Sequence, residues 1–389
     1  QDQGATWDIQ DFQPAGIGSD EILRYTADSY TIVSHGDDIA FAVFHDFADS
    51  FVMISHDNGD SWEKTILYDF PVDLYNMNDE IIDENSDGLA DTMSSSDGSG
   101  ALLFDNNGML HATFGNMNYL DEVVGDAGAY VFYPGLGGLQ YWNETMGANN
   151  SVLLADLEDM DGDDEFTYGS DLANYGVSMT SMSGLAKDDD GNLYVVYSAG
   201  MDNLLFDNGN GATFNYRHLF MKASTDGGNI WGTAVDITPE DAEEESALIE
   251  CVYPSVFPQV VDGSVILTYQ RDLEPGTIAT PGSVDDLIEE GTVILYLEAS
   301  VDQVLSANEA IMNSPFKLYP NPSEDGLVNI AGVNSEYQYY ITDLLGKRIS
   351  EGRLTQGLNT IDTKGFGQGM YLLNMLSGNK SYVEKFILR

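Results

Sequence analysis

An eight-residue phrase occurs twice in the chain, and it constrains the fold more than any other feature. SHDNGDSW and STDGGNIW share the pattern S-x-D-x-G-x-x-W, and each follows an alternating apolar run. The Asp can accept hydrogen bonds from backbone N–H groups ahead of it, the Gly supplies a positive φ, and the Trp can lie back over the sheet. The phrase therefore predicts a strand that enters a tight hairpin turn. The predicted turn residues are Ser55, Asp57, Gly59 and Trp62 in the first copy and Ser224, Asp226, Gly228 and Trp231 in the second.

A second repeat extends this pattern over the first 313 residues. Four segments each contain a short strand, a polar turn and a strand of alternating apolar residues, and their turn glycines are spaced by 72, 83 and 72 residues. Hairpins repeated at a near-constant period predict an all-β fold of the β-propeller type. Six blades are expected, with weaker blades in 69–93 and 143–179, and five or four are the alternatives. A two-sheet β-sandwich remains open as another all-β arrangement.

The repeated phrase resembles the Asp-box, or BNR, repeat of sialidase-like β-propellers. The resemblance is carried by the Ser, Asp, Gly and Trp positions of both copies. It implies that each copy occupies the hairpin between the last two strands of a blade. The alternative is a pair of chance Asp-Gly hairpins in a chain rich in both residues, because such turn dipeptides are common.

Charge divides the chain into two parts. The whole chain has 65 acidic and 14 basic residues, a formal net charge of −51. Residues 314–389 contain eight basic and seven acidic residues, so almost all the negative charge lies in residues 1–313. We therefore predict two domains, 1–313 and 314–389. A nucleic-acid partner is not expected, because phosphate binding needs positive charge.

Three further features bear on the setting of the chain. The single cysteine excludes an intrachain disulfide, and no apolar run reaches the length of a membrane span. The sequence begins without Met or a signal peptide, which predicts a processed, secreted form. Because no apolar run is long enough, we expect no membrane span.

The C-terminal segment predicts about seven short strands separated by Gly, Asn and Ser turns, a small Ig-like β-sandwich. It resembles the type A C-terminal sorting domain of the Bacteroidetes type IX secretion system. The matching motifs are YPNP, DLLGKRI, GMYLL and the terminal KFILR, in this order. Their marker residues are Tyr319, Pro320, Asn321, Pro322, Gly346, Lys347, Gly369, Tyr371 and Lys385.

The resemblance to the sorting domain implies an export route and the secretion proteins that would bind the chain. The chain would cross the periplasm and reach the outer cell surface or the medium through the type IX translocon. The outer-membrane shuttle and sortase of that system would be its partners. The alternative is an Ig-like appendage without an export role.

The sialidase resemblance raises the question of activity. The family's reaction needs three arginines for the substrate carboxylate, an acid/base Asp and a Tyr activated by a Glu. Residues 1–313 contain three arginines, Arg24, Arg217 and Arg271, which are candidate anion-binding residues. The R-I-P phrase of the family is replaced by LRY at the first of them, and no catalytic carboxylate can be chosen. A non-enzymatic binding or structural module is therefore preferred over a sialidase-type glycosidase. A glycan is a candidate ligand, but the sequence does not name the ligand.

One loop has the spacing of a calcium site. Asp83, Asn85, Asp87 and Asp91 follow the pattern D-x-N-x-D-G-x-x-D, with oxygen ligands at positions 1, 3, 5 and 9 around a turn glycine. Position 12 is Ser94, so the loop is not an EF-hand and is nearer to the calcium loops of dockerin or thrombospondin type 3 repeats. Ca²⁺ is the expected metal, and a solvated loop of Asx turns is the alternative.

Overall fold

The structure is a computed structural model of the chain. It describes residues 13–389 with gaps at 20–21, 23–28, 80, 84, 126–128, 161–164, 239–247, 277–291, 306–315, 324–325, 334–336, 344–346 and 378–379. The chain forms two compact units, one of residues 1–221 with 236–299 and one of residues 222–235 with 300–389. The predicted domain boundary after residue 313 lies outside the described residues, and it stays a prediction.

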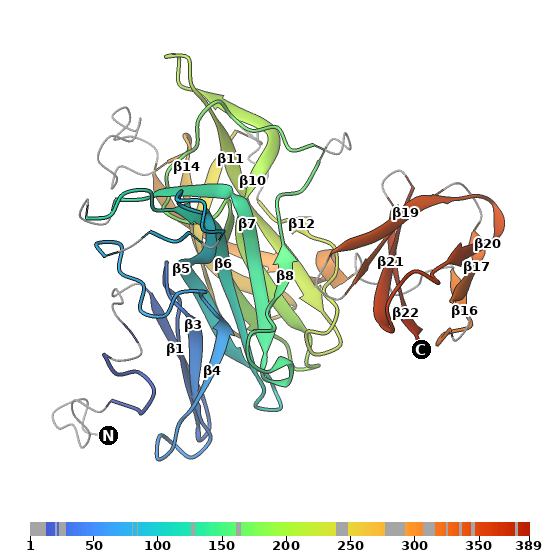
Figure 1. The fold of residues 1–389 in the computed structure, drawn as a ribbon, viewed down its shortest axis with the longest axis horizontal. Helices are drawn as coiled ribbons and strands as arrows, with labels where there is room; N and C mark the ends of the chain where they lie inside the picture. Colours follow the sequence, from blue (N-terminus) through green and yellow to red (C-terminus); the bar gives the residue numbers. More distant parts are fainter. Residues whose placement is uncertain are drawn as a thin grey trace. The chain divides into compact units, whose positions relative to one another are not determined.

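The first unit is built from antiparallel sheets whose strands are neighbours in chain order (Figure 1). The first sheet contains β1 (Tyr30–His35), β2 (Asp38–Val43), β3 (Ser50–Ser55) and β4 (Glu63–Tyr68). The second contains β5 (Met93–Phe104), β6 (Leu110–Leu120), β7 (Val131–Asn143) and β8 (Val152–Ala155), with a 3-10 turn η1 (Glu144–Met146) before β8. Tight turns between alternating apolar strands favour this up-and-down order.

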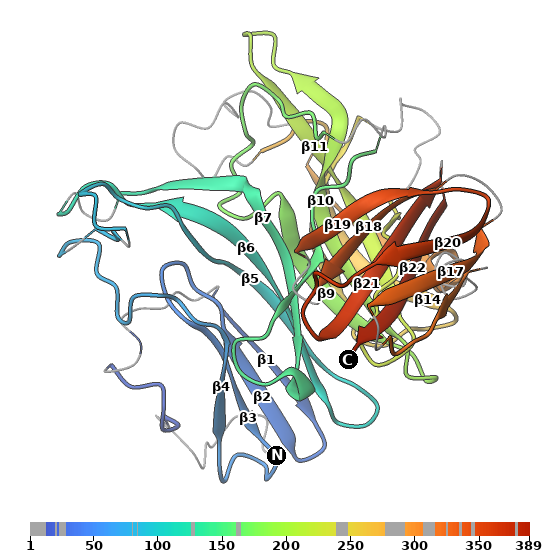
Figure 2. The same ribbon diagram turned by 45° about the vertical axis from the view of Figure 1, so that its right-hand side comes forward.

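Two more sheets follow the same order. The third contains β9 (Thr180–Lys187), β10 (Leu193–Asp207), β11 (Thr213–Ser224) and β12 (Val235–Asp236). The fourth has three strands, β13 (Glu250–Val256), β14 (Ser264–Asp272) and β15 (Val293–Ser300). The first strands of successive sheets are in contact, β1 with β5, β5 with β9 and β9 with β13. Figure 2 shows the strands of the first two sheets side by side as separate layers.

This arrangement confirms the predicted all-β propeller class, because each sheet is a blade-like meander whose first strand meets the first strand of the next sheet. The described residues form four such sheets, so the number of blades stays a prediction. The described residues of 69–93 and 143–179 add no sheet of their own, since β5 begins at the end of the first stretch and β8 completes the second sheet. Both stretches are rich in Asp and Asn, whose side chains engage nearby backbone groups instead.

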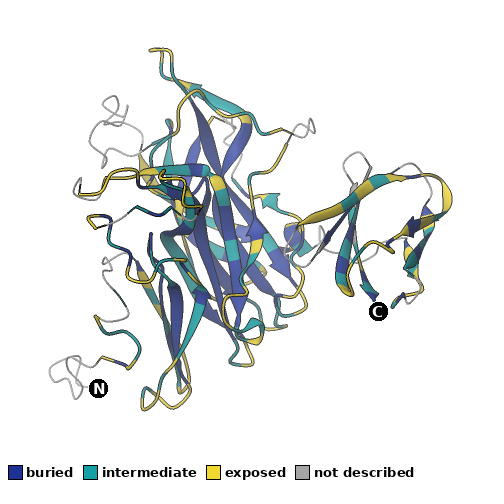
Figure 3. Cartoon of the chain, viewed as in Figure 1, coloured by how far each residue is buried: buried dark blue, intermediate teal, exposed yellow. Residues whose placement is uncertain are grey.

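The blades are held together by apolar faces. Ala40, Ala42 and Val52 of the first sheet are fully buried against Ala112 and Phe114 of the second. Because successive side chains on a strand point to opposite faces, the alternating apolar pattern places these residues on one side of each sheet. Figure 3 shows burial concentrated in the strands and exposure concentrated in the turns.

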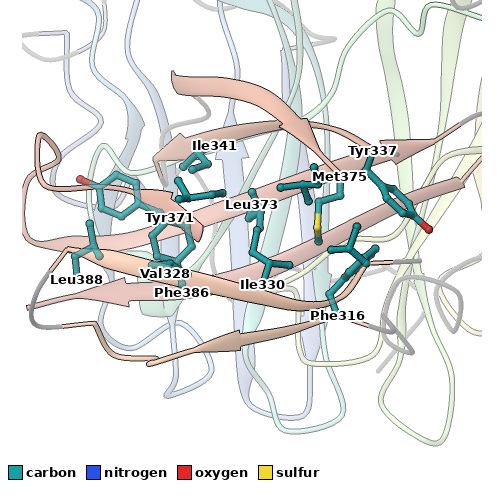
Figure 4. Packing of buried hydrophobic residues seen from close by; sticks show 13 residues of the cluster. Phe316, Val328, Ile330, Tyr337, Ile341, Tyr371, Leu373, Met375, Phe386 and Leu388 are labelled. Atoms are coloured by element: carbon teal, nitrogen blue, oxygen red, sulfur yellow. The ribbon is translucent and has the colours of Figure 1, made fainter. Parts of the chain in front are cut away.

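The second unit contains a sandwich of two sheets, in agreement with the predicted fold. One sheet has the order β16 (Lys317–Tyr319), β17 (Leu327–Val333) and β20 (Gly357–Asp362). The other has the order β19 (Arg348–Leu354), β18 (Tyr337–Asp343), β21 (Gly369–Ser377) and β22 (Lys380–Leu388). Figure 4 shows Val328 and Ile330 of the first sheet packed against Ile341, Leu373 and Phe386 of the second.

Candidate functional site

The two S-x-D-x-G-x-x-W segments fold into the same turn. In the first, Ser55 Oγ accepts from Gly59 N at 2.8 Å and donates to Asp57 Oδ1 at 2.8 Å. Asp57 Oδ1 also accepts from the amide of Ser61 at 2.8 Å. These hydrogen bonds lower the pKa of Asp57 to about 2, the bond from the Ser61 hydroxyl being the largest cause. The turn is closed by its own side chains.

The second turn repeats this pattern. Ser224 Oγ accepts from Gly228 N at 2.9 Å and donates to Asp226 Oδ1 at 2.9 Å. Asp226 Oδ1 accepts from Ile230 N at 2.9 Å, the counterpart of the bond to Asp57 in the first turn. Side chains that satisfy their own loop in this way serve the fold and leave little capacity for a ligand.

The tryptophan of the first turn lies against its sheet, as the pattern predicts. Trp62 donates from Nε1 to Gly59 O at 3.1 Å, and its ring lies 5.4 Å from the ring of Phe41 on β2. Trp231 is half-buried in the second turn. The Trp62 ring anchors the first turn to its sheet through apolar contact.

The three predicted anion-binding arginines do not form one described cluster. Arg24 lies outside the described residues. Arg271 on β14 pairs with Cys251 of β13, and since neighbouring residues on a strand face opposite ways, it lies on the face opposite to Glu250. Arg217 on β11 is 2% exposed and belongs to a buried cluster with Glu250.

This buried cluster links three segments of the chain. Arg217 donates from Nη1 to Ser178 O at 2.9 Å, and its guanidinium lies 4.7 Å from the ring centre of Tyr175. The Tyr175 hydroxyl donates to Glu250 Oε1 at 2.6 Å, and the amide of Arg217 donates to Glu250 Oε2 at 2.5 Å. Burial raises the pKa of Glu250 to about 7, although the hydrogen bond from Tyr175 and the charge of Arg217 oppose it.

The loop predicted to bind calcium is closed by hydrogen bonds to backbone amides. Asp83 accepts from the amides of Asp87 at 3.1 Å and Gly88 at 2.9 Å, and Asn85 Oδ1 accepts from Asp87 N at 2.9 Å. Asp91 accepts from the side chain of Asn85 at 3.0 Å. Within the described ranges, no three His, Cys, Asp or Glu side chains converge as metal ligands. Calcium binding stays a prediction.

A pocket of about 640 Å³ lies where the first strands of the sheets converge. Its wall is formed by β5, β9 and β13, with residues from the ends of β1 and β2. It lies away from the first repeated turn, which follows β3, and toward the other end of the strands. A convergent pocket of this size, lined by polar and aromatic side chains, is the default binding site of a folded domain.

The pocket is shaped by a bulge repeated in three successive sheets. Gly98 (φ 84°), Met182 (φ 55°) and Tyr253 (φ 54°) all adopt left-handed backbone conformations and all line the pocket. Each lies where the pairing register shifts between the first and second strand of its sheet. Bulges re-aim side chains, and left-handed conformations of non-glycine residues are held only when the surrounding structure enforces them. The bulge that recurs in these three sheets therefore shapes the pocket, in addition to the repeated strand order that forms the fold.

The charged side chains of the pocket are acidic. Asp97 is 8% exposed, and its carboxylate accepts from the amides of Ser99 and Ser178, both at 2.9 Å. Burial raises the pKa of Asp97, and the charge of Arg217 opposes the rise. Asp46 lies 2.6 Å from Nδ1 of His45, which also lines the pocket.

Aromatic rings complete the wall. Tyr119 and Tyr130 meet edge to face, with ring centres 5.6 Å apart, and Tyr253 is 45% exposed on the strand β13. Tyr119 donates its hydroxyl to Ser96 O at 2.9 Å, which fixes the ring. None of these residues was among the predicted site residues. Pro254 in an alternating apolar run and Gly98 inside a strand are sequence signals for a bulge.

The motifs of the C-terminal sandwich meet in space. The Asn321 side chain donates to Lys385 O at 2.8 Å and accepts from Ile387 N at 2.9 Å, which joins YPNP to the terminal KFILR. The Tyr319–Pro320 and Asn321–Pro322 peptide bonds are cis. Lys347 is exposed.

The remaining sorting-domain markers that the structure describes lie on β21 and β22. The Tyr371 ring stacks on Phe386 of β22 with ring centres 5.6 Å apart, and Gly369 pairs with Leu388. Lys385 is exposed on β22, and Gly346 lies outside the described residues. The described parts of the motifs therefore either belong to the last two strands, β21 and β22, or contact them.

Comparison with known families identifies this second region. Residues 317–389 match the family model described as the secretion system C-terminal sorting domain. The resemblance to a type IX sorting domain is confirmed, and the chain is exported to the cell surface or secreted. The part of the chain that the structure describes contains no helix long and apolar enough to cross a membrane. A search of the curated proteins finds no match.

Solved structures similar to the chain are propeller proteins with varied titles. A PL25 ulvan lyase aligns with 9% identity over 90% of this chain and 69% of its own, with a TM-score of 0.31. The surface component PorZ of the Porphyromonas gingivalis type IX secretion system aligns with 13% identity over 92% of this chain and 59% of its own, with a TM-score of 0.19. Trypanosoma rangeli sialidase aligns with 12% identity over 92% and 54%, with a TM-score of 0.29. At these scores the likenesses carry no argument about activity.

Proposed function

We propose that the first unit is a non-enzymatic binding module displayed on the cell surface, and that its ligand is a glycan held in the pocket between β5, β9 and β13. The observation that carries this proposal is the bulge repeated in three sheets, which aims Gly98, Met182 and Tyr253 into one pocket. Tyrosine rings suit the apolar faces of sugars, and carboxylates suit their hydroxyl groups.

A glycan array probed with the full, fluorescently labelled chain tests this proposal. Binding to a defined set of glycans is expected, and Tyr253→Ala should remove it because that ring is the most exposed aromatic in the pocket wall. Ile294→Ala is the matched control, since Ile294 is 69% exposed on β15 and does not line the pocket. Binding that survives Tyr253→Ala, or no binding on the array, would contradict the proposal.

A sialidase-type glycosidase is the second candidate, and the pair Tyr175–Glu250 beside Arg217 favours it. A Tyr that hydrogen-bonds a Glu is what such a reaction needs for its nucleophile. Two observations oppose this candidate: Arg217 is buried, and burial raises the pKa of the Tyr175 hydroxyl well above its usual value. Hydrolysis of a fluorogenic sialoside that is lost in Tyr175→Phe would establish the enzyme over the binding module.

We further propose that the two S-x-D-x-G-x-x-W turns are Asp-boxes and that the sorting domain is recognised by the type IX translocon, its shuttle and its sortase. Fusion of residues 316–389 to a folded reporter with a signal peptide should bring the reporter to the surface of a type IX-competent cell. Removal of residues 314–389 should leave the propeller in the periplasm. A truncated chain that is still secreted at the normal level would overturn this assignment.

The loop Asp83–Asp91 is proposed as a Ca²⁺ site on the spacing of its oxygen ligands. An ion bound only by the folded state stabilises it by about 2.7 kcal/mol at a hundredfold excess over Kd. Millimolar Ca²⁺ should therefore raise the melting temperature, and Asp87→Ala should abolish most of that rise while Asp190→Ala should not. Equal melting curves in Ca²⁺ and in EGTA would exclude the site.

A further inference from the structure

The charge of the pocket restricts what it can hold. Asp46 and Asp97 line it, and none of its described lining residues is Lys or Arg. The unit around it adds further negative charge, since residues 1–313 contain 58 acidic and 6 basic residues. A field of this sign raises the local concentration of cations and repels carboxylates and sulfates. Anionic sugars are therefore poor ligands for this pocket.

The burial of Asp97 also favours a cationic ligand. Its carboxylate is nearly buried, so the ionised form lacks most of its hydration, which the side chain of Ser181, two backbone amides and the more distant Arg217 compensate. A ligand cation at the pocket wall would add a charge partner in a region where water screens little. An ammonium group supplies that partner together with three hydrogen-bond donors.

The rest of the lining suits a sugar ring. The tyrosine rings of the wall present π faces, which attract both C–H groups and ammonium groups. Ser29, Ser99 and Ser183 also line the pocket, and serine hydroxyl groups can both donate to and accept from the hydroxyl groups of a saccharide. A simple polyamine would use the charge and has no hydroxyl groups to bond to serine side chains.

We propose that the ligand of this pocket is an amino saccharide with a free ammonium group, in which Asp97 and Asp46 bind the ammonium and the tyrosine wall holds the ring. This inference rests on the proposed glycan-binding function and names the class of glycan. It separates the pocket from sites for acidic sugars, which need basic side chains at the same place.

The test is a calorimetric titration of the full chain at pH 5.5, where the amino group of glucosamine is protonated, with three matched oligosaccharides. Oligomers of glucosamine, N-acetylglucosamine and glucose differ only in the group at C2, which is an ammonium, an acetamide or a hydroxyl. The glucosamine oligomer should bind at least tenfold more tightly than the other two. Its advantage should fall at least fivefold in Asp97→Asn and in Asp46→Asn. Asp190→Asn removes one exposed charge on the β9–β10 turn, outside the pocket, and should change the ratio less than twofold.

Each outcome decides one part of the proposal. Equal binding of all three oligomers would overturn the selection of an ammonium group and leave the glycan-binding function intact. Absence of binding to any glycan on the array and to these oligomers would overturn both. Binding of spermidine or a lysine-rich peptide as tightly as the glucosamine oligomer would overturn the saccharide class. If Asp97→Asn loses the fold by circular dichroism, the Asp46→Asn ratio decides.

Discussion

The two ends of the propeller sheets satisfy their polar groups in different ways. At the turn end, Ser55 and Asp57 bond to groups two to four residues away in their own loop. At the bulge end, Ser178 and Glu250 also bond to groups 33 to 81 residues away, on β5, on β11 and in the segment before β9. Each turn is therefore a local unit, whereas the pocket is held by a network that couples several sheets. Loss of a residue should cost more at the bulge end than at the turn end.

The largest expected effect is at the bulge end. Arg217→Met should lower the free energy of unfolding by about 3–5 kcal/mol, because it removes the cation beside a buried carboxylate and a donor to a buried carbonyl. Urea denaturation of the full chain measures this. Arg271→Met is the control and should cost about 1 kcal/mol or less, since Arg271 is only half-buried.

Recovery in a double variant would identify the cause. Arg217→Met combined with Glu250→Gln removes both charges and should be more stable than Arg217→Met alone. Equal losses for the two arginine variants, or no recovery in the double variant, would show that Arg217 acts only by packing. The bulge end would then be no different in kind from the turn end.

The sequence predicted the turn end well and the bulge end hardly at all. Both turn motifs are contiguous, so the physical cause of the turn lies within eight residues that can be read directly. The pocket depends on contacts such as Ser178 with Asp97, which only the folded chain brings together. Met182 shows the limit, because no local signal predicts a left-handed methionine inside an apolar strand. Arg217 illustrates a second limit, since a residue singled out by its type is buried among structural partners.

Acid and base should affect the two ends in opposite directions. The pKa of Glu250 is raised from 4.5 to about 7 by burial, so between these values the folded state holds a proton that the unfolded state releases. Stability should therefore fall by on the order of 3 kcal/mol as pH rises from about 4.5 to 7, and Glu250→Gln should remove this fall. Urea midpoints measured across this range decide the point.

At the turn end, the stability should depend on pH in the opposite direction. The pKa of Asp57 is lowered to about 2, mainly by the hydrogen bond from the Ser61 hydroxyl, so its contribution is present above about pH 4 and is lost as pH falls toward 2. Asp57→Asn should lack this acid-dependent loss and leave the fall between pH 4.5 and 7 unchanged. A variant that altered both pH ranges would contradict the independence of the two ends.

A smaller effect is expected from the buried serines of the turns. Ser55→Ala and Ser224→Ala should each cost about 1–2 kcal/mol, because each leaves the amide of its turn glycine without its acceptor. The two losses should add to within about 0.5 kcal/mol in the double variant, since the turns share no partner. Strong non-additivity in urea denaturation would mean that the turns are not local units.

The smallest effect concerns the backbone of the pocket itself. Tyr253 is left-handed at φ 54° and 45% exposed, so its side chain adds little burial while its backbone is strained. Glycine adopts this conformation without a Cβ clash, and alanine does not. Tyr253→Gly should therefore be about 1 kcal/mol more stable than Tyr253→Ala, the reverse of the usual order in a strand. Thr268→Gly and Thr268→Ala on the adjacent strand β14 are the control pair, because Thr268 is exposed and has no left-handed backbone, and there alanine should be the more stable. If glycine is the less stable replacement at both positions, the backbone of the bulge is not strained. The bulge at Tyr253 would then be an ordinary irregularity of strand pairing that the surrounding structure does not enforce.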